Sequence, residues 1–260
     1  ERMGGGRLRT IFLIGTASSG KSTLTSALAD WLKENEQSVA TVNLDPAVIS
    51  LPYEPDVDVR ELVDYEQIMA VRGVGPNSAL IYSIREVARN VDALVEEIRD
   101  LAVDYLLVDT PGQMEIFAFR KEGPMIAKAL TLERGAIMYL VDPVLASGPR
   151  SFAASMFLAA SVFLRFSMPM LMAVTKIDIV PPRHMKRIAR WMESQEYFEQ
   201  DLELSSGGVT MLMAREVARA VGEIRSMIPY VMLSSKTLEG FPALHMVITR
   251  LFGEGEDELR

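Results

Sequence analysis

Residues 11–23 read IFLIGTASSGKST, an apolar run followed directly by the spacing G-x-x-x-x-G-K-S. Between a strand and a helix, this spacing is typical of a loop that binds phosphate groups. The glycines let backbone N–H groups turn toward a phosphate, Lys21 adds a positive charge, and the Ser22 hydroxyl reaches Mg²⁺. The residues predicted to hold the phosphates are Gly15, Ser18, Ser19, Gly20, Lys21, Ser22 and Thr23.

Apolar runs of strand length recur along the chain and alternate with helical patterns. They span residues 11–14, 39–44, 105–108, 136–141, 170–174 and 230–233. This alternation predicts a mostly parallel sheet with helices on both faces. Together with the phosphate-binding loop it predicts the α/β fold of the P-loop NTPases. We expect a single domain over residues 1–260, with helical insertions at about 46–103 and 183–228.

Helical periodicity is strongest in the first insertion. It predicts one amphipathic helix on Leu80, Ile84, Val87, Val91, Leu94, Ile98 and Leu101, which recur at steps of three and four. Other helices are predicted over residues 24–32, 59–69 and 150–166.

Composition excludes several classes of site and partner. The chain has no cysteine, and its two histidines, His184 and His245, are far apart, so neither thiolate nor histidine-rich metal sites are expected. Lys and Arg total 27 against 35 Asp and Glu, a net charge of −8, which does not favour direct nucleic-acid binding. No targeting or membrane-spanning segment stands out, so we expect a cytoplasmic protein that does not bind membranes.

Polar motifs follow two of the predicted strands. Asp109-Thr110-Pro111-Gly112-Gln113 follows the run at 105–108, and an acid at the carboxyl end of a buried strand is where such folds hold the Mg²⁺ shell. The Gly112 N–H is expected to donate to a γ-phosphate.

Thr175-Lys176-Ile177-Asp178 follows the run at 170–174. A carboxylate at Asp178 accepts two hydrogen bonds from N1 and N2 of guanine, a donor pair that adenine lacks. The Lys176 stem can lie along the ring. Thr175 stands where many GTPases have Asn, so we expect the hydrogen bonds of that amide to be lost. Ser235, after the run at 230–233, marks the turn whose backbone N–H is expected to meet the guanine oxygen.

Two further stretches lie in or beside the first insertion. Residues 43–47 close the second apolar run with an acid, Asp45, in a loop. Residues 73–78 precede the long helix, where local turn chemistry predicts Asn77 or Ser78 as the N-cap.

Taken together, these motifs resemble the GPN-loop GTPases, in the short form found in archaea. Gly75-Pro76-Asn77 is the tripeptide that names the family, and NLDPA at 43–47, DTPGQ at 109–113 and TKID at 175–178 accompany it in order. The resemblance covers about residues 10–250.

The resemblance implies roles that periodicity could not predict. Family members are dimers across the nucleotide face, and the Gly-Pro-Asn loop of one subunit reaches the phosphates of the other. Asn77 would act in trans, Asp45 would touch the Mg²⁺ shell or the attacking water, and Gln113 would lie near the γ-phosphate. Lys21, Asp45, Gln113 and Asn77 are thus the predicted catalytic residues, and Ser22, Asp45 and Asp109 the predicted metal residues. Eukaryotic relatives help to assemble RNA polymerase II, which implies an assembly role.

The stretch 152–166 is apolar almost throughout but too short to cross a bilayer. Either it is core beneath the sheet, or it offers a face to a subunit or a client peptide.

The sequence therefore predicts a Mg²⁺-dependent GTPase that converts GTP to GDP and switches a homodimer between two states. Three alternatives stay open. A small-molecule kinase of the same fold would use Arg183, Arg187 and Arg190 in a lid. A MinD-like ATPase would need a further lysine, which residues 15–19 lack. A nucleotide-gated scaffold would bind peptides at 152–166.

Overall fold

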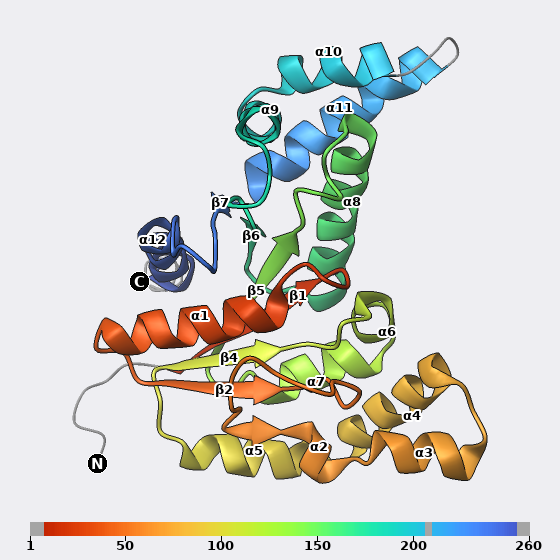
Figure 1. Ribbon diagram of the computed structural model, residues 1–260, viewed down its shortest axis with the longest axis vertical. Helices are drawn as coiled ribbons and strands as arrows, with labels where there is room; N and C mark the ends of the chain where they lie inside the picture. The colour runs from red at the N-terminus through yellow and green to blue at the C-terminus, as the bar shows by residue number, and fades with distance from the viewer. Residues whose placement is uncertain (1–7, 206–209, 254–260) are drawn as a thin grey trace, which may run out of the picture.

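The computed structural model describes residues 8–205 and 210–253, which contain a seven-stranded sheet (Figure 1). The strands are β1 (Arg9–Gly15), β2 (Val39–Asn43), β3 (Val57–Asp58), β4 (Tyr105–Asp109), β5 (Arg134–Val141), β6 (Met170–Val174) and β7 (Tyr230–Met232). Their order is β3-β2-β4-β1-β5-β6-β7, and every neighbouring pair is parallel. The six predicted strands are confirmed, and the sheet is wholly parallel.

Two apolar cores cover the two faces of the sheet. Side chains alternate along β1, so Ile11 and Leu13 join one core and Phe12 and Ile14 the other. Helices α1 (Lys21–Glu34) and α12 (Phe241–Gly253) pack on the first face (Figure 1). The second face is covered by helices that include α6 (Met114–Ala118), α7 (Glu122–Leu130) and α8 (Pro149–Phe166).

The first insertion contains more breaks than its periodicity predicts. It forms α2 (Val59–Leu62), α3 (Tyr65–Arg72), α4 (Pro76–Arg89) and α5 (Val91–Asp100). The single helix expected on residues 80–101 is therefore wrong, because Asn90 ends α4 and its side-chain amide donates to the Glu86 carbonyl at 2.9 Å. The helix expected over 59–69 is also two, since the Asp64 side chain caps α3.

The second insertion forms α9 (Pro182–Glu193), α10 (Gln195–Ser205) and α11 (Thr210–Met227) at one end of the molecule (Figure 1). Residues 206–209 of this predicted insertion, and the ends 1–7 and 254–260 of the predicted domain, lie outside the described residues. Trp191 of α9 is fully buried and donates to Asp201 of α10 at 2.8 Å, which joins the two helices. None of the described helices is long and apolar enough to cross a membrane.

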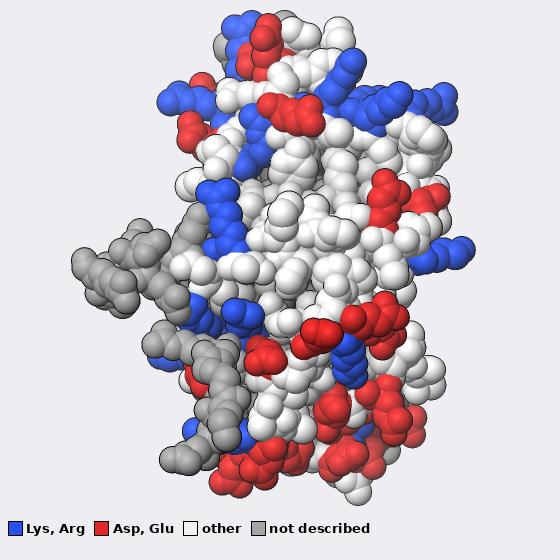
Figure 2. Space-filling view, turned by 90° about the vertical axis from the view of Figure 1, so that its left-hand side faces the viewer, with Lys and Arg blue, Asp and Glu red and all other residues white. Residues whose placement is uncertain are grey.

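Charge is unevenly distributed along the long axis. In the face shown in Figure 2, acidic side chains gather toward the end that holds α5, and basic ones are more frequent toward the end that holds the second insertion. Helix α9 contributes Arg183, Lys186, Arg187 and Arg190. Residues 182–227 as a whole carry seven Lys and Arg against seven Asp and Glu, so this end is neutral and the basic side chains are concentrated on α9.

Candidate functional site

The loop between β1 and α1 contains left-handed backbone and one close backbone approach, and both favour glycine. Gly20 has φ +95°, and Ser18 also lies in the left-handed region at φ 61°. A Cβ at Gly15 would lie 2.7 Å from Ser19 Oγ and 2.9 Å from the Leu140 carbonyl, so only glycine fits there. No side chain caps the start of α1, which leaves its first N–H groups available to an anion.

Lys21 lies across this loop. Its Nζ donates to the carbonyls of Gly15 at 3.0 Å and Thr16 at 3.1 Å. Burial lowers the pKa of Lys21, against the pull of Asp109 and Asp45, which raise it. A phosphate bound here would favour the charged lysine.

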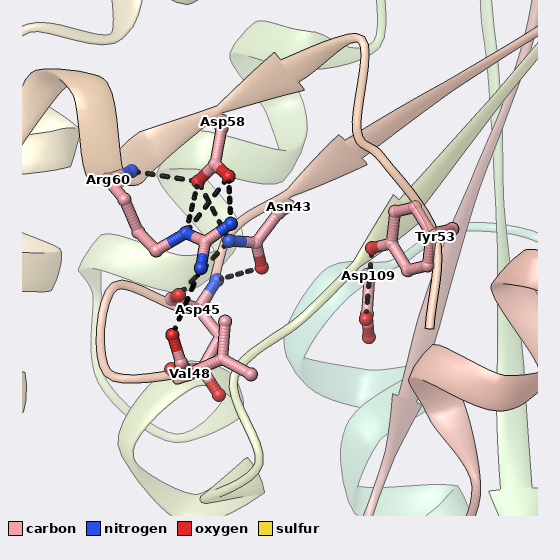
Figure 3. Close-up of polar contacts among 7 residues, drawn as sticks. All are labelled: Asn43, Asp45, Val48, Tyr53, Asp58, Arg60 and Asp109. Carbon is pink, nitrogen blue, oxygen red and sulfur yellow. Dashed lines mark hydrogen bonds and ion pairs between the residues drawn. The ribbon is translucent and has the colours of Figure 1, made fainter. Parts of the chain in front are cut away.

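Asp109 stands at the end of β4, beside Leu13 of β1. It is only 2% exposed, and burial raises its pKa to about 6 although the hydroxyls of Ser22 and Tyr53 favour the ionised form. The Tyr53 hydroxyl donates to Asp109 Oδ2 at 3.1 Å (Figure 3).

The donor set fits a Mg²⁺ ion of the kind that binds with a nucleotide. Within the described part of the chain no three Asp, Glu, His or Cys side chains gather into a metal cage. Mg²⁺ at nucleotide sites uses one or two carboxylates, a hydroxyl, waters and phosphate oxygens, so no such cage is needed. Among the described residues Asp109 Oδ1 is buried without a hydrogen-bond partner, which suits an acceptor for such a shell.

Asp45 and the 109–113 motif meet directly. Asp45 Oδ2 accepts a hydrogen bond from the Gly112 N–H at 3.0 Å, and its Oδ1 accepts one from the Ala47 N–H at 3.0 Å. Gln113 Nε2 donates to Asn77 Oδ1 of the same chain at 3.0 Å. The structure therefore brings the four predicted catalytic motifs to one edge of the sheet.

The Gly-Pro-Asn stretch differs from the local expectation. Helix α4 begins at Pro76 with Gly75 as its N-cap, so neither Asn77 nor Ser78 is the cap. Asn77 instead lies in the first turn, exposed, with its side chain directed to Gln113.

A network behind Asp45 holds its loop (Figure 3). Asp58 Oδ1 accepts from Asn43 Nδ2 at 2.9 Å, and Asn43 Oδ1 accepts from the Asp45 N–H at 3.0 Å. Arg60 pairs with Asp58 at 2.6 Å and donates to the Val48 carbonyl at 3.2 Å. Burial alone would raise the pKa of Asp58, but hydrogen bonds from Arg60 and Asn43 hold it below its usual range.

The residues predicted to read the base lie at the ends of β6 and β7. Asp178 is exposed, and its Oδ1 accepts from Ser234 Oγ at 2.7 Å. Lys176 Nζ contacts Asp142 Oδ2 at 2.9 Å and the Ser18 carbonyl, so the side chain links the residue after β5 to the phosphate-binding loop. Ser235 is half-buried in the turn that follows.

The amide of the usual Asn is absent at Thr175, and a hydroxyl contact stands at this position. The buried Thr175 hydroxyl donates to the Ser19 carbonyl at 2.8 Å, which ties the β6 end to the phosphate-binding loop. A hydroxyl thus supplies a structural hydrogen bond at the position where many GTPases have an amide.

Two predicted features lie away from this edge. Arg187 and Arg190 pack over the rings of Trp191 and Tyr197 within their own insertion, and Arg183 is exposed at the start of α9. Stacked on aromatic rings, two of the three arginines are used in the packing of α9.

Helix α8 contains the apolar stretch 152–166, and part of it is core while another part is exposed. One side, including Phe152, Met156 and Val162, is core, whereas Phe157 and Phe163 are each 40% exposed. A groove of about 430 Å³ runs between α8, α10 and α11. It is lined by Arg150, Ala153, Ala154, Phe157, Leu202, Met213, Ala214 and Val217.

Sequence reasoning missed Tyr53, Asp58 and Asp142, and for the turn at 234–236 it predicted a backbone N–H contact but not the contact of the Ser234 hydroxyl with Asp178. Ser234 is one residue from the predicted Ser235, and a single residue decides which side chain meets Asp178. Tyr53 lies in a loop between Pro52 and Pro55 with no periodic signal. Its contact depends on how that loop folds back over β4.

Comparisons with known proteins identify the relatives of this chain. A family model described as "Conserved hypothetical ATP binding protein" matches residues 13–254. The chain is 34% identical over 236 residues to GPN-loop GTPase PAB0955 of Pyrococcus abyssi, covering 90% of this chain and 93% of that protein. It is 30% identical over 259 residues to GPN-loop GTPase 1 of Schizosaccharomyces pombe, covering 95% and 70%.

The crystal structure of PAB0955 in its apo form superposes with a TM-score of 0.84 at 33% identity, over 94% of this chain and 97% of that one. Some relatives are longer: the chain spans 48% of GPN-loop GTPase 1 of Dictyostelium discoideum.

Proposed function

Because this chain belongs to the GPN-loop GTPase family, we propose that it binds GTP with Mg²⁺ and hydrolyses it to GDP and phosphate. One observation carries the proposal: Lys21, Asp109, Asp45 and Asp178 stand at the carboxyl edge of one parallel sheet, where such folds bind ligands.

In the proposed reaction a water attacks the γ-phosphorus and the bond to the β–γ bridging oxygen breaks. Lys21 Nζ turns from its loop carbonyls to the phosphates, and loop N–H groups stabilise the charge that builds on the bridging oxygen. Mg²⁺, when bound, supplies positive charge to the β- and γ-phosphate oxygens. Asp45 orients the water.

The Gly112 N–H gives this site a switch. It donates to Asp45 Oδ2 at 3.0 Å, and one N–H cannot serve Asp45 and a γ-phosphate equally well. We propose that GTP takes this donor and frees the Asp45 carboxylate for the water, and that GDP allows the contact to re-form.

Asp45→Asn tests the role of the carboxylate. The amide oxygen can still accept one of the two N–H groups that Asp45 holds, from Gly112 or from Ala47, so binding of a non-hydrolysable GTP analogue with Mg²⁺ is expected to persist. The rate of hydrolysis is expected to fall about 100-fold or more, the size of a lost acid–base group. A normal rate would refute the assignment.

Equilibrium binding of non-hydrolysable GTP and ATP analogues tests the base. We expect a preference for GTP of about 100-fold or more, and its loss in Asp178→Asn. Xanthosine triphosphate should then bind the variant, because its C2 carbonyl accepts from the new amide. Equal binding of ATP by the unaltered chain would favour the kinase and MinD-like alternatives.

We also propose that the chain works as a homodimer in which Asn77 reaches the partner's phosphates. The support is that Asn77 is exposed beside Gln113 at the open edge of the site. Mixing equal amounts of Lys21→Ala and Asn77→Ala chains should restore about a quarter of the normal activity if Asn77 acts in trans. If it acts within its own chain, as its contact with Gln113 would allow, the mixture stays inactive.

The apolar groove supports a client-binding role. We propose that it holds an apolar peptide segment during assembly of a protein complex such as RNA polymerase. Transfer of labelled γ-phosphate to a small molecule rather than to water would instead favour the kinase alternative.

A further inference from the structure

Asp109 is a buried carboxylate whose two oxygens have different surroundings. Oδ2 accepts the Tyr53 hydroxyl at 3.1 Å, and a hydrogen bond from the Ser22 hydroxyl also favours the ionised carboxylate. Oδ1 is buried and, among the described residues, has no hydrogen-bond partner. A side chain held by one oxygen in this way presents the other in a fixed direction.

Tyr53 reaches Asp109 from a loop that is anchored on both sides. Ser26 Oγ of α1 donates to the Pro52 carbonyl at 3.3 Å. Beyond Tyr53, Asp56 Oδ2 accepts from the backbone N–H and the hydroxyl of Thr41 in β2, at 2.7 and 3.1 Å. Because both anchors are on elements that flank the site, the ring has little freedom to leave Asp109.

The same loop is continuous with Asp45. It leaves β2 at Asn43, includes Asp45 and Tyr53, and enters β3 at Val57, where Asp58 contacts the Asn43 side chain (Figure 3). The segment thus contains Asp45, the carboxylate predicted to orient the water, and through Tyr53 it contacts Asp109, a predicted metal residue.

We propose that Tyr53 is a positioning residue for Mg²⁺: its hydroxyl fixes Asp109 Oδ2 so that Oδ1 faces the magnesium shell. The proposal rests on the proposed Mg²⁺-dependent GTP site. Tyr53 touches neither nucleotide nor metal, and it acts only through Asp109.

The test is release of a fluorescent GDP derivative, measured as Mg²⁺ is titrated, in Tyr53→Phe. This change removes one oxygen and leaves the ring. We expect the Mg²⁺ concentration for half-maximal slowing of release to rise about tenfold, the size of one lost hydrogen bond to a charged group. The release rate in EDTA should be unchanged, since the phosphate-binding loop is intact.

Tyr105→Phe is the matched control. It also removes a hydroxyl that takes part in a hydrogen bond, accepted from Arg9 Nη1 at 2.9 Å, but at the other end of the sheet. Its Mg²⁺ midpoint should equal that of the unaltered chain.

A double-mutant cycle separates positioning from general loosening. In an Asp109→Asn background, Tyr53→Phe should change the Mg²⁺ midpoint no further. An unchanged or lower midpoint in Tyr53→Phe alone, or an equal additional shift in the Asp109→Asn background, would overturn the proposal. If the unaltered chain binds the GTP analogue but Mg²⁺ has no effect, this inference falls while guanine binding stands. If it binds no guanine nucleotide, the proposed function fails first.

Discussion

Burial of the Asp109 carboxyl has a cost in stability. Burial raises its pKa from 3.8 to about 6. A carboxyl with a raised pKa binds its proton more tightly in the folded chain than in the unfolded one. It therefore destabilises the nucleotide-free fold above about pH 6, and the cost vanishes below about pH 4. At neutral pH the cost is about 3 kcal/mol.

Asp109→Asn is accordingly expected to stabilise the nucleotide-free protein by up to about 3 kcal/mol at pH 7.5, with the gain shrinking toward pH 4. Urea denaturation at several pH values measures it. Asp30→Asn, on the exposed side of α1, is the control and should change stability by less than about 0.5 kcal/mol. If Asp109→Asn instead makes the protein less stable at pH 7.5, burial of the Asp109 carboxylate does not lower the free energy of unfolding as its raised pKa predicts.

At this scale, sequence reasoning found the residues whose neighbours along the chain define them. Lys21 and Asp109 lie in motifs whose spacing alone places them. Tyr53 and Ser234 act through contacts with residues 56 positions away, at Asp109 and Asp178. No local pattern encodes such contacts, because they depend on how loops fold back over the sheet edge.

Among the elements, α6 and α7 pack closely at their junction behind the site. A Cβ at Gly123 would lie 1.9 Å from the Phe117 carbonyl oxygen, which belongs to backbone and cannot rotate away. Helix α6 follows directly on the 109–113 motif, so the packing of this junction supports the site.

Gly123→Ala is expected to destabilise the fold by about 1–3 kcal/mol or more, because α6 and α7 must separate. Thermal unfolding measures the loss. Gly253→Ala, at the end of α12, should be nearly neutral, because among the described residues nothing outside its own turn lies within 4 Å of the added Cβ. Equal stability of the two variants would show that the junction tolerates the added atom by a small shift.

The elements themselves were predictable where apolar runs were bounded by polar motifs, as at residues 136–141. Periodicity could not locate the break at Asn90, because Leu94 and Ile98 continue the apolar spacing and are buried whether the helix is one or two. The two-residue strand β3 was not predicted from the sequence, for a different reason. It is shorter than any alternating pattern, and its pairing with β2 is tertiary.

For the whole molecule, the groove and the edge predicted to read the base are joined by a short segment. Asp142, which pairs with Lys176 at 2.9 Å, directly follows β5, and residues 142–149 lead from it to the start of α8. Arg187 of α9 donates to the Ser147 carbonyl at 2.6 Å within that segment. A nucleotide that moves Lys176 thus has a physical route to the groove.

Coupling of this kind is reciprocal in binding free energy. If GTP changes the affinity of an apolar peptide for the groove about fivefold or more, the peptide must change the affinity of GTP by the same factor. A labelled peptide rich in Leu and Phe, titrated with and without a non-hydrolysable GTP analogue and then in the reverse order, measures both. Phe157→Ser should weaken the peptide, whereas Phe163→Ser, equally exposed on α8 but outside the groove, should not. Peptide binding that is identical with and without nucleotide would leave α8 an apolar surface with no link to the GTP site.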